Sequence, residues 1–367
     1  MRGAVAMAAM TIKKYVFSRA TSKGIPVSGT FELTSRCNLD CKMCYIHAAQ
    51  CDRMAMEREL TADQWLDLAR QAVDAGMIYL LLTGGEPMLR PDFVQIYTGL
   101  AKMGIIVSVN TNATILTPRI LEAFQQYPPE RVNVTLYGAS AGTYGALCGN
   151  ADGYELAMRH IKALKQAGVN VNINTTFTRL NISDMDRLVS FSKEIDAPVG
   201  MAAYLFPPVR GGCGVDSVFL DPEDLGRAAA KFDWMTLAPD VLQARAEMIR
   251  TTLDEPRTAP AKESRAAACT AGRGSFWITW DGKMLPCGML LSGADVIGQD
   301  LVTAWQQTKE NIKQYLLPVE CLSCRYQAVC PSCVAISADE EGNGVLQEPM
   351  CRRTEVYAEE LLRYAQL

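Results

Sequence analysis

The stretch SRCNLDCKMCY, residues 35–45, places Cys37, Cys41 and Cys44 at unequal gaps of three and two residues. A structural zinc site needs four protein ligands in a tetrahedral array, and no fourth cysteine or histidine stands here in a matching pair pattern. A four-iron four-sulfur cluster accepts this arrangement, because three thiolates hold three irons and leave the fourth iron open for a small molecule. The stretch therefore predicts an iron–sulfur site with one open position.

The chain on either side of this stretch alternates between strand-like and helix-like patterns. Six nearly continuous apolar runs, at 27–34, 77–85, 105–112, 131–138, 169–177 and 198–206, predict strands of a buried parallel sheet. Amphipathic segments between them, at 61–76, 118–127, 154–168 and 182–195, predict helices. Sheets of this kind carry active sites at the carboxyl ends of their strands, and SRCNLDC, TGGEP, NTNAT and YGAS follow the first four runs. The sequence thus predicts an α/β fold with its site at that edge.

Composition and charge exclude several functional classes. The chain has 367 residues, of which 49% are apolar and 21% charged, so it has room for more than one packed unit. Its formal charge of -4 and the absence of a Lys/Arg cluster argue against a nucleic-acid partner. No apolar run approaches the roughly 20 residues of a membrane-spanning helix, so we expect no membrane partner. We expect the first ten residues to be a short disordered leader.

The cysteine count is the largest anomaly in the composition. Thirteen cysteines in a chain long enough to build a core favour metal binding in a cytoplasmic protein over a secreted disulfide scaffold. Only two histidines exist, His47 and His160, so mixed Cys/His zinc sites are nearly excluded and the ligands must be thiolates. His47 or Cys51 remains an alternative fourth ligand beside the first three cysteines.

The cysteine triplet after the first strand, together with Gly84-Gly85-Glu86-Pro87 after the second, resembles the radical S-adenosylmethionine (radical SAM) superfamily over residues 28–225. The resemblance implies a partial (β/α)6 TIM-like barrel in which Cys37, Cys41 and Cys44 hold the catalytic cluster. The amino and carboxylate groups of S-adenosylmethionine then chelate the open iron. Further S-adenosylmethionine contacts are implied at the strand ends and in the cluster loop: Met43, Gly84, Gly85, Glu86, Asn112, Thr135 and Asn181. Met43 departs from the aromatic residue often found at its position.

A second set of cysteines resembles the SPASM extension, which holds two auxiliary four-iron clusters. By this resemblance Cys321, Cys324, Cys330 and Cys351 fill the distal cluster, and Cys269, Cys287 and Cys333 hold the proximal one. Seven cysteines thus serve the eight ligand positions of the two clusters, and the eighth position is either open or filled by Cys213. A zinc ribbon is the alternative for the whole region. The implied organisation is an amino-terminal extension, the radical SAM barrel, a helical linker and the SPASM domain: 1–27, 28–225, 226–262 and 263–367.

The segment VTLYGASAGTYGALCG, residues 134–149, resembles maturases of ribosomally made peptides. The resemblance implies a precursor peptide as substrate, modified by a thioether or carbon–carbon link or by epimerisation, with Arg210 and Cys213 as candidate substrate contacts. Implied partners are a flavodoxin or ferredoxin as electron donor and a separate leader-binding protein, since only about 27 residues precede the first strand. Tetrapyrrole or quinone cofactor synthesis is the alternative. Gly288 after Cys287 argues against a sulfatase maturase. A non-catalytic iron–sulfur electron carrier is the alternative from a different functional class.

Overall fold

The computed structural model describes residues 11–202, 204–206, 209, 218–254, 265–266, 269–338 and 344–366. Six parallel strands form the centre of one sheet: β1 (Ser28–Glu32), β4 (Tyr79–Thr83), β5 (Ile106–Thr111), β6 (Arg131–Thr135), β7 (Val171–Thr175) and β8 (Val199–Met201). They follow one another in this order across the sheet, and each lies within a run predicted from the sequence. The α/β prediction of a partial barrel is therefore confirmed.

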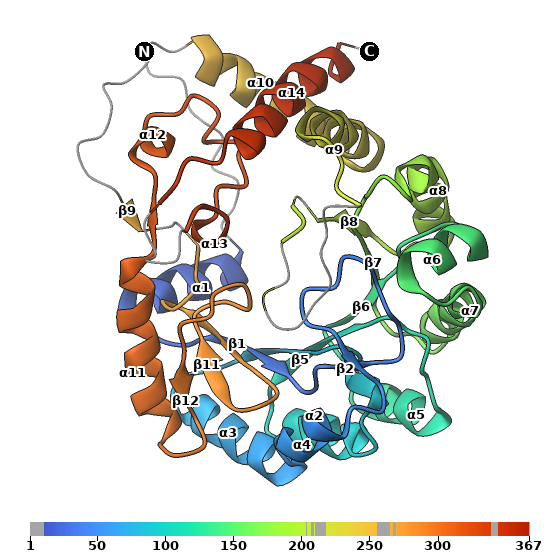
Figure 1. Ribbon diagram of the computed structural model, residues 1–367, viewed down its shortest axis with the longest axis vertical. Coiled ribbons are helices and arrows are strands. Elements are labelled where there is room, and N and C mark those ends of the chain that lie inside the picture. Colours follow the sequence, from blue (N-terminus) through green and yellow to red (C-terminus); the bar gives the residue numbers. More distant parts are fainter. Residues whose placement is uncertain are drawn as a thin grey trace.

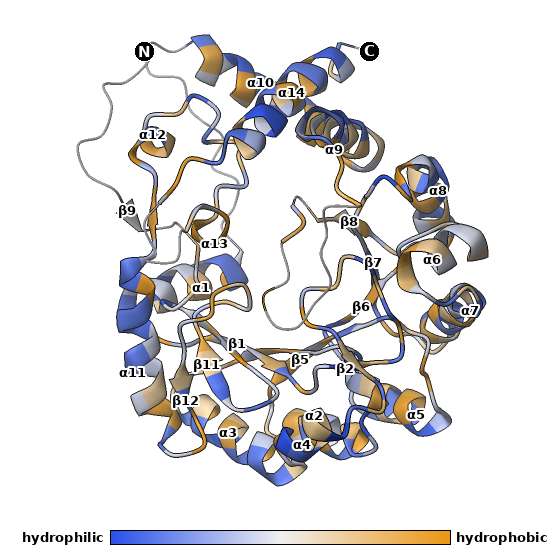
Figure 2. Ribbon diagram, viewed as in Figure 1, coloured by the Kyte–Doolittle hydropathy of each residue, from blue (hydrophilic) through white to orange (hydrophobic). Residues whose placement is uncertain are grey.

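Helices cover the outside of these strands (Figure 1). They are α3 (Ala62–Asp74), α4 (Phe93–Lys102), α5 (Pro118–Gln126), α6 (Ala141–Cys148), α7 (Asp152–Gln166), α8 (Met185–Glu194) and α9 (Pro222–Thr236). Figure 2 shows that these outer helices carry both apolar and polar residues. In α3, a capping box between Thr61 and Gln64 fixes the first turn, and Trp65 and Leu68 face the core. Amphipathic helices of this kind close the hydrophobic core against the strands.

The carboxyl-terminal part of the chain extends the same sheet. Strand β10 (Ser275–Ile278) pairs in parallel with β1, and β11 (Lys283–Leu285) and β12 (Ala294–Asp295) continue in antiparallel fashion. The remaining carboxyl-terminal elements are α10 (Pro239–Asp254), β9 (Arg265–Ala266), α11 (Leu301–Asn311), β13 (Leu316–Leu317), α12 (Val319–Leu322), α13 (Val334–Ser337) and α14 (Glu348–Tyr364). The sheet therefore crosses the predicted boundary between barrel and cysteine-rich domain.

The amino-terminal extension contains a helix, α1 (Ile12–Lys23). The Phe17 ring lies 5.3 Å from that of Tyr79, and the Trp305 indole donates a hydrogen bond of 2.9 Å to the carbonyl of Gly24. The helix thus contacts both halves of the chain. The predicted leader, residues 1–10, lies outside the described residues. No helix among the described ranges is long and apolar enough to span a membrane.

Candidate functional site

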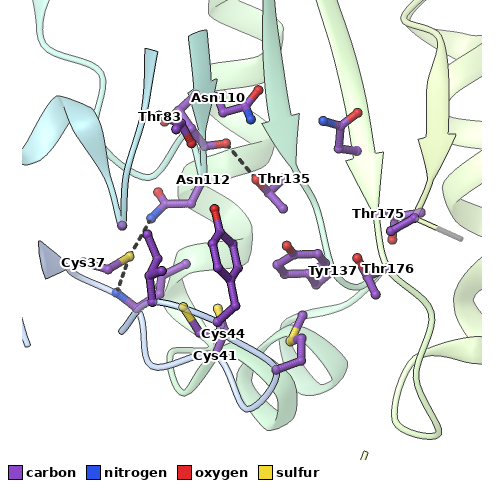
Figure 3. Close-up of a pocket in the computed structure, with 18 of the residues that line it drawn as sticks. Cys37, Cys41, Cys44, Thr83, Asn110, Asn112, Thr135, Tyr137, Thr175 and Thr176 are labelled. Carbon is purple, nitrogen blue, oxygen red and sulfur yellow. Dashed lines mark hydrogen bonds between the residues drawn. The ribbon is translucent and has the colours of Figure 1, made fainter. Parts of the chain in front are cut away.

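A cavity of about 460 Å³ opens at the carboxyl ends of the parallel strands (Figure 3). Eight residues predicted for the site line it: Cys37, Cys41, Met43, Cys44, Gly84, Gly85, Asn112 and Thr135. The three thiols lie together along one side, and the strand ends supply the polar groups opposite them. This volume lies within the range of small-molecule sites.

The loop that carries the three cysteines is held from below by the end of α6. The backbone N–H of Asp40 donates to the carbonyl of Cys148 at 3.0 Å, and that of Lys42 donates to Leu147 at 3.0 Å. A short pairing of β2 (Arg36–Cys37) with β3 (Ala48–Ala49) closes the loop on its other side. The loop is therefore fixed by backbone hydrogen bonds, although it contains little regular structure.

The pKa values of two thiols of this loop, Cys37 and Cys41, are raised in the metal-free protein. Burial raises the pKa of Cys37 to about 12, and the nearby Glu86 carboxylate acts in the same direction. For Cys41 the hydrogen bond with the buried thiol of Cys148 raises the pKa most, followed by burial. Iron binding would have to displace these protons, because the thiolate is the ligand.

Gly84 and Gly85 bring the end of β4 against the cysteine loop. A Cβ atom on Gly84 would lie 2.4 Å from the carbonyl oxygen of Thr34, and one on Gly85 would lie 2.3 Å from that of Arg36. Gly84 also has φ +154, a conformation that side chains disfavour. The backbone N–H of Gly85 donates to Thr34 at 2.7 Å. Only glycine allows this approach, which leaves backbone exposed to the cavity.

The carboxylate of Glu86 lies behind the cavity wall and does not line it. It is fully buried and accepts hydrogen bonds from the N–H of Met88 at 3.0 Å, the hydroxyl of Thr111 at 2.8 Å and the N–H of Asn112 at 2.7 Å. Burial raises the pKa of Glu86 to about 7, although these three hydrogen bonds lower it. Glu86 thus ties the end of β4 to the end of β5.

Asn112, held by Glu86, is placed next to the thiols. Its side-chain N–H₂ lies 3.6 Å from the Sγ of Cys37 and donates to Asn38 at 3.0 Å. Figure 3 shows the contact with Cys37 as a dashed line, with Thr135 on the neighbouring strand. The Thr135 hydroxyl donates to the carbonyl of Thr111 at 3.2 Å. Both residues can reach a ligand in the cavity.

Asn181, which was predicted as a cofactor contact, does not line this cavity. Its amide N–H₂ donates to the carbonyls of Tyr137 and Thr176, both at 2.9 Å. Its oxygen accepts from the N–H and hydroxyl of Thr178, at 2.6 and 2.9 Å. Because every donor of the amide is used, Asn181 instead fixes the loops after β6 and β7.

Several cavity residues were not predicted from the sequence. They are polar or aromatic side chains at strand ends and on α6: Thr83, Asn110, Thr111, Tyr137, Tyr144, Asn174, Thr175 and Thr176. The signal that could have found them is a polar residue inside an otherwise apolar strand close to its carboxyl end. Burial raises the pKa of Tyr137 and of Tyr144, so both hydroxyls stay protonated. Arg210 and Cys213 lie outside the described residues.

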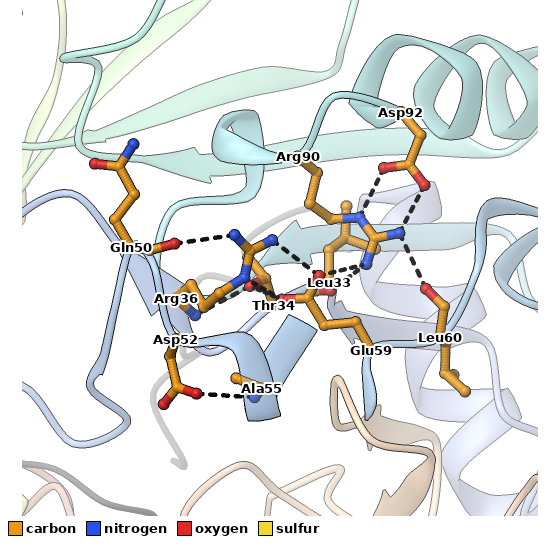
Figure 4. A network of polar contacts seen from close by, with 10 residues as sticks. All are labelled: Leu33, Thr34, Arg36, Gln50, Asp52, Ala55, Glu59, Leu60, Arg90 and Asp92. Atoms are coloured by element: carbon orange, nitrogen blue, oxygen red, sulfur yellow. Dashed lines mark hydrogen bonds and ion pairs between the residues drawn. The ribbon is translucent and has the colours of Figure 1, made fainter. Parts of the chain in front are cut away.

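A buried network of charges supports the cysteine loop from the outside (Figure 4). The Glu59 carboxylate accepts from Arg36 Nε at 2.7 Å and from a terminal nitrogen of Arg36 at 3.0 Å. It also accepts from Arg90 at 3.3 Å, and Arg90 continues to Asp92 at 2.7 Å. Glu59 thereby joins the residue before Cys37 to the segment after Glu86.

The auxiliary cysteines fall into two groups. Burial and the thiolates of Cys351, Cys330 and Cys324 raise the pKa of Cys321 to about 11, so these four thiols lie near one another. The charge of Cys269 raises the pKa of Cys333 in the same way, with burial again the larger cause. Cys287 packs against the apolar cluster of Leu290, Ile312, Leu317 and Val334, as does Cys321. Within the described ranges, no three Cys, His, Asp or Glu side chains surround a point that could hold a metal ion. A four-iron cluster places each thiolate on a different iron, so its ligands stand further apart than those of one ion.

The cavity at the strand ends fits the predicted cluster and cofactor in its chemistry. Three thiols border it, and the buried hydroxyls of Tyr144 and Thr175 have no hydrogen-bond partner in the part of the chain that the structure describes. Buried polar groups are nearly always paired, so these hydroxyls indicate a polar ligand.

Comparison with known proteins gives matches of three kinds. A family described as the Radical SAM superfamily matches residues 31–192. The chain is 28% identical over 342 residues to an AdoMet-dependent heme synthase of Methanosarcina barkeri, with 88% of this chain and 95% of that protein covered. It is 26% identical over 340 residues to one of Nitratidesulfovibrio vulgaris, with 88% and 90% covered.

Solved structures share the fold at lower identity. Streptococcus suis SuiB superposes with a TM-score of 0.66 and 19% identity, over 92% of this chain and 81% of that one. The enzyme anSMEcpe with bound AdoMet gives a TM-score of 0.68 and 16% identity, over 93% and 99%. At these identities the likeness concerns the fold alone.

Proposed function

We propose that the cavity at the strand ends is the site of reductive S-adenosylmethionine cleavage, on the premise that residues 31–192 match the Radical SAM superfamily. Cys37, Cys41 and Cys44 would hold a four-iron cluster, whose chemistry is to pass one electron to the sulfonium of S-adenosylmethionine. This yields methionine and a 5′-deoxyadenosyl radical, which takes a hydrogen atom from the substrate. The observation that carries the proposal is the placement of three thiols opposite the Gly84–Gly85 strand end around one ligand-sized cavity.

The chain's own residues would position the cofactor and exclude water. Gly84 and Gly85 expose backbone groups that can approach the methionyl part of the cofactor closely. The Asn112 amide and the Thr135 hydroxyl point into the cavity from β5 and β6, where they can bind polar groups. Tyr137 and Tyr144 wall the cavity with rings that keep out solvent, which a reactive radical requires.

The first test is cleavage itself. After anaerobic reconstitution, three clusters would give on the order of 12 irons per chain. The variant with Cys37, Cys41 and Cys44 all changed to Ala should lose about a third of this iron and all formation of 5′-deoxyadenosine with a chemical reductant. Formation of 5′-deoxyadenosine is measured by chromatography and mass spectrometry, and its persistence in the variant would refute the site. Replacement of the exposed Cys51 by Ala tests the alternative fourth ligand, and unchanged iron content and 5′-deoxyadenosine formation would exclude it.

For the substrate, we propose a tetrapyrrole on the path to heme. The support is similarity to proteins called AdoMet-dependent heme synthase, which extends over 88% of this chain and at least 90% of theirs in two cases. A precursor peptide is the second candidate, favoured by the resemblance of residues 134–149 to peptide maturases. A flavodoxin or ferredoxin would supply the electron in either case, and a separate leader-binding protein belongs to the peptide candidate alone.

The two substrates are separated by isotope transfer. A deuterated tetrapyrrole precursor that accelerates S-adenosylmethionine cleavage and passes deuterium to 5′-deoxyadenosine would support the first candidate. Transfer from a deuterated peptide, with none from the tetrapyrrole, would reject it in favour of the second.

A further inference from the structure

A second cavity, of about 470 Å³, lies where α9, α10 and α14 meet the loop of the auxiliary cysteines. Its polar lining consists of Asp233, Arg245, Cys330, Arg353 and Tyr357, and its walls are otherwise apolar. The cavity adjoins the first one, because Met201 at the end of β8 lines both. It therefore lies between the predicted distal cluster and the barrel.

Arg353 is a buried cation that has no acceptor among the described residues of this cavity. The residue is 5% exposed, and its Nε has no hydrogen-bond partner in the described ranges. Its guanidinium lies over the ring of Tyr357, 5.2 Å from the centroid, which is a weak substitute for an anion. Burying a charge without an opposite charge is costly, so a compensating group is expected.

Asp233, the one carboxylate among the described residues that line the cavity, is already engaged. Asp233 accepts a hydrogen bond from Arg245 and another, of 2.5 Å, from the Tyr357 hydroxyl. Arg245 also donates to the Tyr357 hydroxyl at 3.1 Å. These three groups satisfy one another, and Arg353 is left over.

Arg353 is held firmly beside the cysteines that are predicted to bind the distal cluster. A Cβ on Gly226 of α9 would lie 2.6 Å from the carbonyl oxygen of Arg353, so the two helix backbones touch there. The next residue, Thr354, places its hydroxyl 3.6 Å from the Sγ of Cys330. Cys351 precedes Arg353 by two positions on the same helix. The backbone of Arg353 therefore stays beside Cys330 unless α14 separates from α9.

We propose that Arg353 is the counter-charge of an iron–sulfur cluster held by Cys321, Cys324, Cys330 and Cys351, and that it raises the reduction potential of this cluster. The proposal rests on the proposed clusters. Four thiolates around a four-iron core give a net negative charge that grows by one on reduction, so a fixed cation nearby favours the reduced form. Arg353 acts through its charge on the cluster and does not contact the substrate. The cluster can then pass electrons at a less negative potential.

The test uses the reconstituted protein in which Cys37, Cys41 and Cys44 are Ala, so that the auxiliary clusters are observed alone. Arg353→Gln, Arg353→Lys and Arg352→Gln are compared by redox titration followed by electron paramagnetic resonance. Arg352 is the matched control, because it is the neighbour on α14, is 49% exposed and pairs with Glu223 at 2.8 Å.

Arg353→Gln should decrease the equilibrium constant for reduction of one cluster at least tenfold. For a one-electron couple this lowers the midpoint potential by about 59 mV. Arg353→Lys should keep most of the original potential, and Arg352→Gln should match the parent. Equal potentials in Arg353→Gln and Arg352→Gln would overturn the proposal. If Arg353→Gln does not load iron, retention of iron by Arg353→Lys still supports a role for the charge. Loss of iron in both variants overturns the proposal. Absence of any auxiliary iron would also overturn it, while leaving S-adenosylmethionine cleavage at the first cluster untouched.

Discussion

Removal of the Glu59 carboxylate should destabilise the cysteine loop more than any surface substitution near it. Glu59 and Arg36 are each 7% exposed, and Arg90 is 5% exposed, so the charges are shielded from water. In Glu59→Ala, Arg90 keeps Asp92 and the carbonyls of Leu33 and Leu60. Within the described ranges, Arg36 keeps one acceptor besides Glu59, the carbonyl of Gln50 at 3.1 Å. The variant therefore buries one uncompensated guanidinium, which costs about 3–5 kcal/mol.

Chemical denaturation of the metal-free, reduced protein measures this loss as a change in the free energy of unfolding. Glu57→Ala is the control, because Glu57 belongs to the adjoining helix α2 (Arg53–Arg58) and is exposed. Its effect should stay within about 0.5 kcal/mol. The carbonyl of Arg36 also accepts a hydrogen bond of 2.9 Å from the backbone N–H of Glu86. Because Arg36 precedes Cys37, iron loading at Cys37 should weaken in Glu59→Ala as well. Equal stabilities of the two variants would refute this account of the network.

Two further predictions follow from the buried titratable groups. The pKa of Glu86 is raised from 4.5 to about 7, so the native protein holds this proton more tightly than the unfolded chain, and the associated stability is lost as the pH rises through 7. Glu86→Gln should remove this pH dependence. Its free energy of unfolding relative to that of the parent should therefore rise by roughly 3 kcal/mol between pH 4.5 and 7.5. A difference between variant and parent that does not change with pH would contradict the raised pKa of Glu86. Cys148→Ala should lower the pKa of Cys41 in the metal-free protein, because the hydrogen bond between these thiols is the largest cause of its elevation. Alkylation of Cys41 at pH 8, followed by mass spectrometry with Cys37 as internal reference, should become faster, and an unchanged rate would argue against that hydrogen bond.

The strands were predictable because apolar residues recur along them, consecutively in the centre of β4 and at alternate positions in β6 and β7. Several helices were not predicted, and α4 and α6 of the barrel show why. Segment 141–148, which forms α6, contains Gly142 and Gly145 and has no polar face, because Tyr144, Leu147 and Cys148 are all buried. Segment 93–102, which forms α4, has two buried aromatic residues that a local pattern does not distinguish from a strand.

The candidate site was predictable as a set of loops but not as a set of contacts. Strand order places the cysteine triplet and Gly84–Gly85 at one edge, so their meeting follows from topology. Whether a carboxylate or an amide at that edge faces the ligand or the protein depends on rotamers, and Glu86 and Asn181 both turned inward. The position of Arg353 beside Cys330 depends on helix packing across the chain and carries no local signal.

The pairing of β10 with β1 makes the chain indivisible at its predicted domain boundary. Cutting the chain before β10 would turn β1 into an edge strand, with Phe31 and its neighbours offering unpaired backbone to other molecules. It would also remove Trp277, whose indole donates to the buried Glu32 at 2.9 Å, and Phe276, which packs on Gly29. The barrel and the cysteine-rich region should therefore unfold as one cooperative unit, so a damaged auxiliary region would expose an aggregation-prone edge in the catalytic half itself.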